Sequence, residues 1–199
     1  MEFKIKKHIF EERRKECTTD TQYIFMLSGY YWAERQFRGT SNMVILDAAC
    51  GTGYGSNYLA EKGYKVIGID ISPKAINFAI KKYKKTNLTF LIMDCRNLNF
   101  PDSMFDAVIS QDTIEHISED KKFLEEIVRV LKPSGKAIIF TPYSKTHTEK
   151  PLNPFHVREY SYESFKNLLQ VYFSDVKIYG RKFGKELREV ENEFNKIRK

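Results

Sequence analysis

The stretch Val44-Ile-Leu-Asp-Ala-Ala-Cys-Gly-Thr-Gly-Tyr-Gly55 joins a short apolar run to three closely spaced glycines. The run Met43 to Leu46 lacks the alternation of a half-exposed strand, which is typical of a strand buried on both faces of a parallel sheet. Glycines after such a strand let the backbone turn tightly with positive φ and approach a ligand without interference from Cβ atoms. The stretch therefore predicts a buried strand, a ligand-binding turn and the start of a helix.

Strand and helix patterns alternate along the rest of the chain. Strands separated by helices need right-handed crossovers, which give a doubly wound, mostly parallel α/β sheet of Rossmann-like type with a ligand crevice at the strand carboxyl ends. The periodicity predicts helix Tyr54 to Lys62, strand Lys65 to Ile69, helix Pro73 to Tyr83, strand Leu88 to Ile92, strand Ala107 to Ser110, helix Glu119 to Leu131, strand Lys136 to Phe140, helix Tyr162 to Tyr172 and strand Val176 to Tyr179.

The length and composition predict one compact domain. The chain has 199 residues, of which 42% are apolar, enough for a sizeable core. Helical spacing before the sheet predicts a helical lid within residues 1–40, followed by the sheet and its helices in 41–183 and a charged tail in 184–199. One or two of the aromatic residues of that lid, Tyr23, Tyr31 and Trp32, are expected to face the ligand.

Charge and cysteine content narrow the cellular context. The 33 basic and 26 acidic residues give a net charge of +7, but the excess is spread over helix faces, which favours solvation over nucleic-acid binding. The three cysteines are odd in number and far apart, so they predict neither a disulfide framework nor a zinc site. With no signal peptide and no membrane-length apolar run, we expect a cytoplasmic monomer or homodimer without a membrane partner.

Three acidic residues at successive strand ends indicate which ligand the glycine turn binds. Asp47 directly precedes the turn, where it would repel a pyrophosphate but could orient a cationic amino group. Asp70 ends the second strand, where a carboxylate can accept hydrogen bonds from two ribose hydroxyls. Asp94 ends the third strand, in position to receive an adenine amine. This order argues against the G-x-G-x-x-G dinucleotide site of an NAD-dependent oxidoreductase.

Four segments together resemble the successive motifs of class I S-adenosylmethionine-dependent methyltransferases, especially the small bacterial type-11-like group. They are Asp47-Ala-Ala-Cys-Gly-Thr-Gly53, Gly68-Ile-Asp-Ile-Ser72, Phe105-Asp-Ala-Val-Ile-Ser-Gln-Asp-Thr-Ile-Glu-His116 and Val130-Leu-Lys-Pro-Ser-Gly135. The resemblance implies that S-adenosylmethionine is the cofactor and that the protein is a methyltransferase. The cofactor-binding residues it implies are Asp47, Ala49, Gly51, Gly53, Asp70, Ile71, Asp94, Cys95 and Gln111.

The same resemblance assigns a part of the cofactor to each residue. The loop at Gly51 and Gly53 would hold the methionine moiety, Asp70 the ribose, and Asp94 with its neighbour the adenine, while Gln111 would contact the methionine end. The chain departs from the family in two places. Ala49 replaces the usual first glycine, and no final strand follows Tyr179, so the chain either ends early or completes its sheet edge differently.

Histidines are the candidate bases for the methyl acceptor. The thioether that leaves a sulfonium needs no protonation, but a hydroxyl acceptor must lose a proton, for which a neutral histidine is suited. His116 follows the fourth strand, and His156 lies in the loop after the fifth. We therefore interpret His116 and His156 as catalytic candidates, whereas His8 and His147 have no comparable context.

A metal site is a more specific alternative to the interpretation of these histidines as bases. Asp112, Glu115, His116 and His156 offer two carboxylates and two imidazoles, a ligand set suited to a divalent ion. The D-x-x-E-H spacing is similar to the E-x-x-E-H of metal-dependent O-methyltransferases that act on quinone precursors and on the terminal 2′-hydroxyl of small RNAs.

The leading acceptor is a hydroxyl of a sugar, glycan precursor or small metabolite. The segment Asn153-Pro-Phe-His-Val-Arg-Glu-Tyr160 resembles a loop of methyltransferases associated with bacterial glycan modification, and Arg158 could pair with a substrate phosphate or with a neighbouring acid. An RNA 2′-O-methyltransferase, metal-dependent or not, is the alternative enzyme. A cofactor-binding regulatory subunit without catalysis is the alternative from another class.

Overall fold

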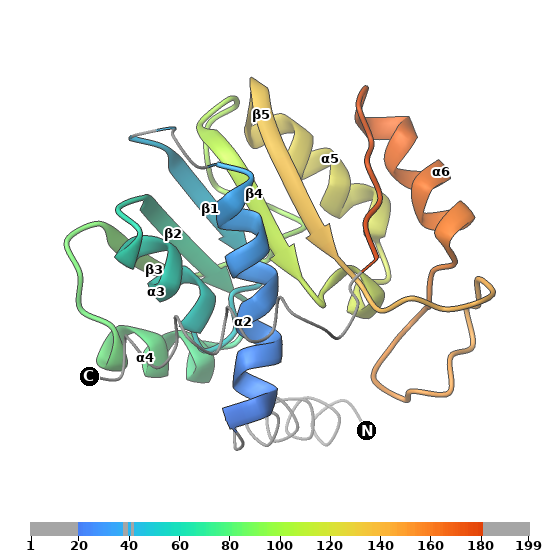
Figure 1. Ribbon diagram of the computed structural model, residues 1–199, viewed down its shortest axis with the longest axis horizontal. Helices are drawn as coiled ribbons and strands as arrows, with labels where there is room; N and C mark the ends of the chain where they lie inside the picture. The colour runs from blue at the N-terminus through green and yellow to red at the C-terminus, as the bar shows by residue number, and fades with distance from the viewer. Residues whose placement is uncertain (1–19, 38–39, 41, 181–199) are drawn as a thin grey trace. The chain divides into compact units, whose positions relative to one another are not determined.

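The computed structural model describes residues 20–37, 40 and 42–180 (Figure 1). Two compact units are distinguished, Gly39–Ile178 and a second formed by Met1–Arg38 with Tyr179–Lys199. His8, Cys17, the helical pattern before residue 20 and the charged tail 184–199 lie outside the described residues. The sheet and all the candidate site residues belong to the unit 39–178.

A five-stranded sheet forms the centre of that unit, with the order β3-β2-β1-β4-β5 (Figure 1). Every adjacent pair of strands is parallel. The order reverses between β1 and β4, and in such sheets ligands bind at the carboxyl ends of the strands beside the reversal. The strands are β1 (Val44–Ala48), β2 (Lys65–Asp70), β3 (Leu88–Ile92), β4 (Phe105–Gln111) and β5 (Leu131–Phe140).

Helices cover both faces of the sheet, as the alternating pattern predicted. The helices α3 (Tyr54–Glu61) and α4 (Pro73–Lys82) contact β2 and β3. Ser72 begins α4 as its N-cap by accepting a hydrogen bond from the Ala75 N–H, and Pro73 needs no amide partner at the first helical position. The predicted start of this helix at Pro73 is thereby confirmed.

A hydrophobic core lies on the other face of the sheet. The helices α5 (Asp120–Val130) and α6 (Tyr162–Tyr172) contact each other, and α5 contacts β5. Strand side chains one position apart alternate in direction, so those of Leu46, Ala48 and Ile69 pack with the apolar sides of the two helices. The buried helix residues of this core are Phe123, Leu124, Ile127, Val130, Phe165 and Leu169.

The strand β5 begins earlier than the sequence predicted. Leu131 already pairs with Phe105, but the next pair joins Lys136 to Ala107, so residues 132–135 bulge out of the strand. Gly135 fits there because a Cβ atom would lie 2.8 Å from Leu131 Cδ2 and 2.9 Å from the Lys132 carbonyl oxygen.

The strand predicted over Val176 to Tyr179 is wrong, since residues 173–180 form no strand in the described part of the chain. Val176 and Ile178 nevertheless pack, partly buried, against the core. Their apolar alternation produces burial, but a strand also needs a neighbour with which to exchange backbone hydrogen bonds.

The described N-terminal segment forms one helix, α2 (Asp20–Arg35), in the unit that also holds Tyr179. The Trp32 and Tyr179 rings lie 5.0 Å apart. A role of this helix as a lid stays a prediction. No helix in residues 20–37 or 42–180 has both the length and the apolar character needed to span a bilayer.

Candidate functional site

A left-handed turn follows β1 at the carboxyl edge of the sheet. Ala49, Gly51 and Gly53 have φ angles of 63°, 56° and 80°. The Cys50 N–H donates to the Ile69 carbonyl oxygen over 2.7 Å, and the Gly53 N–H donates to the Cys50 carbonyl oxygen over 3.0 Å. The structure thus confirms the tight positive-φ turn that the glycine spacing predicted, and it shows that Ala49 adopts the conformation for which a glycine is better suited.

The glycines of this turn meet different needs. A Cβ atom on Gly51 would meet nothing within 4 Å, so this position faces open space where a ligand can approach the backbone. A Cβ atom on Gly53 would lie 2.6 Å from the Phe90 ring and 2.8 Å from Ala79 Cβ. Gly53 is therefore required for the packing of α4 and β3 beneath the turn, whereas Gly51 leaves the backbone of the turn open to approach.

Asp47 lies beneath the turn. Its side chain is fully buried, and the Ser56 hydroxyl donates a hydrogen bond of 2.5 Å to its Oδ2 atom. This hydrogen bond links the end of β1 to α3, on the two sides of the turn. Because the Asp47 side chain is fully buried, any contact with a cationic ligand group would have to be made inside the protein.

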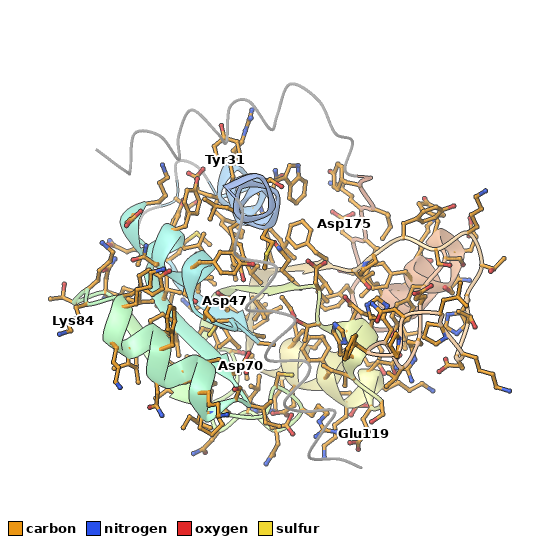
Figure 2. The ribbon with its side chains drawn as sticks, turned by 90° about the horizontal axis from the view of Figure 1, so that it is seen from below. Tyr31, Asp47, Asp70, Lys84, Glu119 and Asp175 are labelled. Carbon is orange, nitrogen blue, oxygen red and sulfur yellow. The ribbon has the colours of Figure 1, made fainter. Side chains whose placement is uncertain are left out.

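Asp70 joins the turn to the end of β2 (Figure 2). The Gly51 N–H donates to Oδ2 over 2.9 Å, and the Ser72 N–H donates to Oδ1 over 2.8 Å. A carboxylate at the end of the second strand, beside the glycine turn, is the kind of group that accepts hydrogen bonds from ribose hydroxyls. The arrangement fits a nucleoside whose ribose lies beside Gly51.

Exposed apolar side chains lie next to Asp70 at the same edge of the sheet. Ile71 is 65% exposed and Ile92 is 55% exposed, and Ile92 is the β3 residue in register with Asp70. Large exposed aliphatic side chains at the carboxyl ends of neighbouring strands suit a planar apolar ligand surface such as an adenine ring.

Asp94 is bound by a residue that the sequence analysis did not single out. The Arg96 guanidinium donates to both Asp94 oxygens, with Nη2 to Oδ2 at 2.7 Å, and its Nη1 donates to Glu119 at 2.7 Å. These hydrogen bonds from Arg96 hold the pKa of the Asp94 carboxyl below its usual value. An adenine amine would meet an ion pair here, and the Asp-x-Arg spacing was the available signal.

The two described cysteines are free thiols. Burial, with the nearby Asp94 carboxylate, raises the pKa of Cys95 to about 12, and burial also raises the pKa of Cys50. Both therefore stay neutral at physiological pH, which suits packing against a ligand and not nucleophilic chemistry.

The loop after β4 is tied to the loop after β5. Gln111 ends β4 almost fully buried, and Asp112 turns the chain with a φ of 50° while its N–H donates to the Phe140 carbonyl oxygen. Glu115, in the 3-10 turn η1 (Ile114–His116), is fully buried and accepts a 3.0 Å hydrogen bond from the Thr141 hydroxyl at Oε2.

The structure brings His116 and His156 together. The centroids of the two rings lie 4.9 Å apart in an edge-to-face arrangement, although forty positions separate the residues in the sequence. His116 Nδ1 donates to the Phe155 carbonyl oxygen over 2.7 Å, which assigns the lone pair of the neutral ring to Nε2. His156 Nδ1 donates to Glu159 Oε1 over 3.2 Å, and its Nε2 accepts from the Asn153 amide over 3.0 Å.

Three of the four proposed metal ligands cluster. One ligand atom from each of Glu115, His116 and His156 lies within 4.8 Å of the others, and Glu115 Oε1 is 3.9 Å from His116 Nε2. Asp112 is not in this group, so the four-residue set was wrong in that member. Asp112 lies in a left-handed turn before η1, with a φ of 50°, whereas Glu115 and His116 lie within η1.

The remaining candidates of the acceptor loop are paired with protein groups. Arg158 forms ion pairs with Asp120 at 3.0 Å and Glu149 at 3.3 Å, which favours the neighbouring-acid interpretation over a bound phosphate. His147 also contacts Glu149, at 3.0 Å, and is not in the His116 cluster.

Comparisons with known proteins support the cofactor interpretation of this crevice. Residues 46–139 match a family model described as a methyltransferase domain. The chain is 31% identical over 151 residues to a Mycobacterium tuberculosis protein named "Probable S-adenosylmethionine-dependent methyltransferase", covering 74% of this chain and 54% of that protein. It is 35% identical over 142 residues to phosphoethanolamine N-methyltransferase 1 of Zea mays, covering 69% of this chain and 26% of that enzyme.

Solved structures agree in fold. A Pyrococcus horikoshii protein superimposes with a TM-score of 0.65 at 29% identity, covering 84% of this chain and 90% of that one. The [4+2]-cyclase SpnF, at 23% identity, has a TM-score of 0.64 over 72% of this chain and 56% of its own. At that identity the likeness concerns the fold alone, and a cyclase among the neighbours shows that the fold does not determine the reaction.

The chain spans about half the length of the mycobacterial relative and about a quarter of the maize enzyme. The matched segment nevertheless begins within β1 and ends within β5, and it includes the glycine turn and Asp70. Together with the parallel sheet and its order reversal, these matches show that the chain contains a domain of the class I S-adenosylmethionine-dependent methyltransferase family.

Proposed function

We propose that the protein transfers the methyl group of S-adenosylmethionine to a hydroxyl of a sugar, glycan precursor or small metabolite. The observation that carries this proposal is the orientation of the His116 ring in η1, the 3-10 turn that follows β4 at the carboxyl edge of the sheet. Its Nδ1 donates to the Phe155 carbonyl oxygen, so Nε2 is the basic nitrogen, and the side chain is 23% exposed. A neutral imidazole held in one tautomer beside the cofactor crevice suits the removal of a proton from an acceptor.

The cofactor-binding residues have distinct roles in this proposal. Gly51 admits the methionine moiety, Asp70 receives the ribose hydroxyls, and Ile71 lies under the adenine. Asp47 and Gly53 support the turn from within the protein, since both are in contact with core residues. Methyl transfer is an in-line displacement, so alignment and exclusion of water are the main contributions asked of the protein.

Calorimetric titration tests the cofactor part of the proposal. The full chain is titrated with S-adenosylhomocysteine, S-adenosylmethionine and NAD. Micromolar binding of the two sulfur ligands without binding of NAD is expected, because Asp47 disfavours a pyrophosphate at the turn. Binding of NAD alone would contradict the proposal.

A screen of methyl acceptors tests whether His116 is the general base. Sugars, nucleotide-linked sugars and small hydroxylated metabolites are offered with radiolabelled S-adenosylmethionine, and the wild type is compared with His116→Ala and with the loop control His147→Ala. Loss of a general base lowers the rate by about 100-fold to 10,000-fold. Transfer is expected to fall by this factor in His116→Ala with unchanged cofactor affinity, and to persist in His147→Ala.

An amine acceptor is the second candidate, favoured by the similarity to phosphoethanolamine N-methyltransferases. An ammonium group must also lose a proton before it attacks, so the same histidine could serve it. Phosphoethanolamine therefore belongs in the screen, and a product methylated on nitrogen would replace the hydroxyl assignment. Cofactor binding without transfer to any acceptor would favour the regulatory subunit.

The cluster of Glu115, His116 and His156 favours a metal-assisted form of hydroxyl transfer. Imidazole and carboxylate ligands suit a divalent transition metal, which would lower the pKa of an acceptor hydroxyl. Zinc and manganese titrations with His116→Ala as the comparison test this form, and equal binding by both proteins would exclude these residues as the site.

A further inference from the structure

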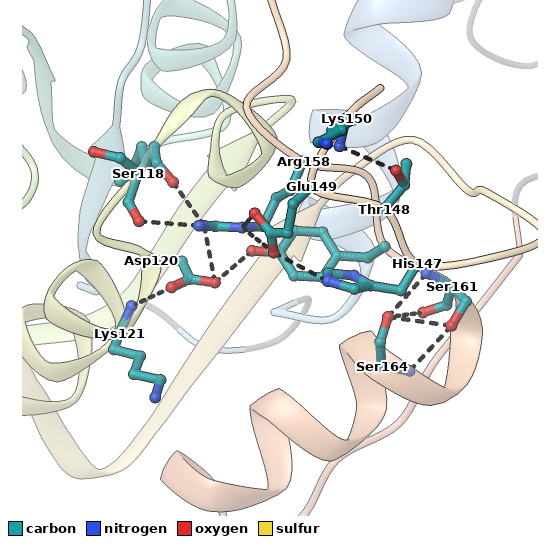
Figure 3. A network of polar contacts seen from close by, with 12 residues as sticks. Ser118, Asp120, Lys121, His147, Thr148, Glu149, Lys150, Arg158, Ser161 and Ser164 are labelled. Atoms are coloured by element: carbon teal, nitrogen blue, oxygen red, sulfur yellow. Dashed lines mark hydrogen bonds and ion pairs between the residues drawn. The ribbon is translucent and has the colours of Figure 1, made fainter. Parts of the chain in front are cut away.

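Arg158 connects the loop after β5 to the segment between η1 and α5 (Figure 3). Its Nη1 donates to the Ile117 carbonyl oxygen over 2.8 Å, and its Nη2 donates to the Ser118 carbonyl oxygen over 3.0 Å. The same guanidinium forms ion pairs with Asp120, at the start of α5, and with Glu149, across its own loop. One side chain thus reaches two carbonyl groups and two carboxylates.

The surroundings make this contact specific for a guanidinium. The Arg158 side chain is only 12% exposed, and the Asp120 side chain is 15% exposed. The Tyr160 hydroxyl donates to Asp120 Oδ2 over 2.7 Å, which holds that carboxylate toward Arg158. A planar group with several N–H donors matches carbonyl and carboxylate acceptors in different directions, which the point charge of lysine does not.

The backbone beside Arg158 is also bound to the η1 turn. The Val157 N–H donates to the Glu115 carbonyl oxygen over 2.8 Å, and the Arg158 N–H lies 3.4 Å from the same oxygen. His156 directly precedes these two residues, and its ring meets that of His116 at 4.9 Å. Arg158 and the Glu115 carbonyl therefore hold the backbone next to His156 against the η1 turn.

We propose that Arg158 is a positioning residue for methyl transfer, which holds the loop after β5 so that the His116 and His156 imidazoles meet at the crevice. The proposal rests on the function proposed above, in which His116 is the base. It goes beyond that function because Arg158 makes its contacts with protein groups and acts only through the histidine pair.

Arg129 provides a matched control. Its guanidinium donates to Glu126 at 2.7 Å and Asp102 at 2.8 Å, and to the carbonyl oxygens of Leu98 and Phe100 at 2.7 and 2.8 Å. It therefore makes the same kinds of bond in the same unit of the protein. Its partners do not belong to the histidine cluster, so Arg129→Ala reports the general cost of removing such a group.

The first readout needs no acceptor. Two-bond proton–nitrogen spectra of the full chain with bound S-adenosylhomocysteine distinguish the two neutral histidine tautomers, and the chain has four histidines. The wild type is expected to show the Nδ1–H form for His116 and His156. Arg158→Ala should replace these signals by those of exchanging tautomers, while Arg129→Ala should retain them.

Chemical rescue separates positioning from general destabilisation. Arg158 lines a cavity of about 310 Å³ together with residues such as His147, Ser164 and Leu168, so a free guanidinium ion can enter the space left in Arg158→Ala. Guanidinium below denaturing concentration should restore both tautomer signals, and equal concentrations of sodium chloride or urea should not.

Enzyme activity is the third readout, and it can be measured once a methyl acceptor is known. Misplacement of a catalytic group by about 1 Å costs about 100-fold in rate, so kcat of Arg158→Ala should fall by about this factor and recover with guanidinium. Unchanged tautomer signals in Arg158→Ala, or an equal loss in Arg129→Ala, would overturn the inference. Cofactor titration of the same proteins is a separate measurement, so failure of the methyltransferase assignment is seen independently.

Discussion

The backbone N–H of Gly51 donates a 2.9 Å hydrogen bond to Oδ2 of Asp70, which joins the turn after β1 to the end of β2. The second oxygen of the same carboxylate accepts from the Ser72 N–H at the start of α4. One buried side chain therefore holds the two backbone segments between which a ribose would bind, and its loss affects both the shape of the site and a direct ligand contact.

Removal of this carboxylate should weaken cofactor binding strongly. Asp70→Ala takes away the acceptor for two backbone N–H groups and the proposed partner of the ribose, and a charged hydrogen bond contributes about 1.5–3 kcal/mol. We expect at least a tenfold loss of S-adenosylhomocysteine affinity by calorimetry. Asp175→Ala is the control, since that carboxylate is 75% exposed and pairs only with Lys177 among the contacts described. Equal affinity of the two variants would contradict the ribose role.

The two glycines of the turn should respond differently to alanine. Gly53→Ala places a methyl group 2.6 Å from the Phe90 ring in addition to the positive φ, so overpacking should lower the free energy of unfolding by about 2–4 kcal/mol. Gly51→Ala meets open space and should cost only about 1–2 kcal/mol of backbone strain, but its methyl group would obstruct the ligand. Denaturant titration and cofactor calorimetry measure the two effects, and equal loss of stability would contradict the assignment.

Replacement by glycine should destabilise the protein less at position 49 than at the neighbouring Ala48. Its φ of 63° strains an alanine by about 1–2 kcal/mol, which offsets the roughly 0.5–1 kcal/mol entropic cost of glycine. Ala49→Gly is therefore expected to keep or slightly raise the free energy of unfolding. Ala48→Gly is the comparison, because Ala48 is fully buried within β1 and loses a packed methyl group without relief of strain. A larger destabilisation at position 49 than at 48 would argue against the left-handed turn.

The ion pair of Asp94 with Arg96 should give stability a specific pH dependence. Hydrogen bonds from Arg96 lower the pKa of Asp94 below its usual 3.8, so the folded state binds this proton less tightly than the unfolded state. The stabilisation is therefore present above pH 3.8 and is lost as the pH falls through the lower, folded-state pKa. Denaturant titration of wild type and Asp94→Asn should show a difference that is constant near neutrality and shrinks in acid. A difference independent of pH would exclude the ion pair as its source.

Local patterns anticipated most of the fold. The apolar run before Asp47, the Ser72-Pro73 helix start and the spacing of the core residues of α5 each depend on near neighbours in the chain, and the structure contains the corresponding elements. The strand expected at Val176 to Tyr179 differs because strand formation depends on a partner elsewhere in the chain. Apolar alternation alone does not specify that partner.

For the candidate site, too, the sequence was sufficient to predict some features and not others. The turn at Gly51 and the acids at strand ends were visible in the sequence because parallel strands bring their carboxyl ends to one edge of the sheet. The binding of Asp94 by Arg96 could have been suspected from their spacing. The distinction between the two glycines could not, since it depends on where Phe90 and Ala79 pack.

The sequence by itself determined the order of strands and helices and the family of the cofactor turn, because hydrophobic period, glycine spacing and helix caps act over a few residues. Only the tertiary structure decided that His156 meets His116, that Asp112 stays outside their cluster, and that Arg158 bridges Ile117 and Ser118 to Glu149. These contacts join residues that lie far apart in the chain. They depend on the path of the long loop after β5, which side-chain ion pairs and hydrogen bonds to carbonyl groups hold in place. The hydrophobic periodicity of the sequence does not specify that path.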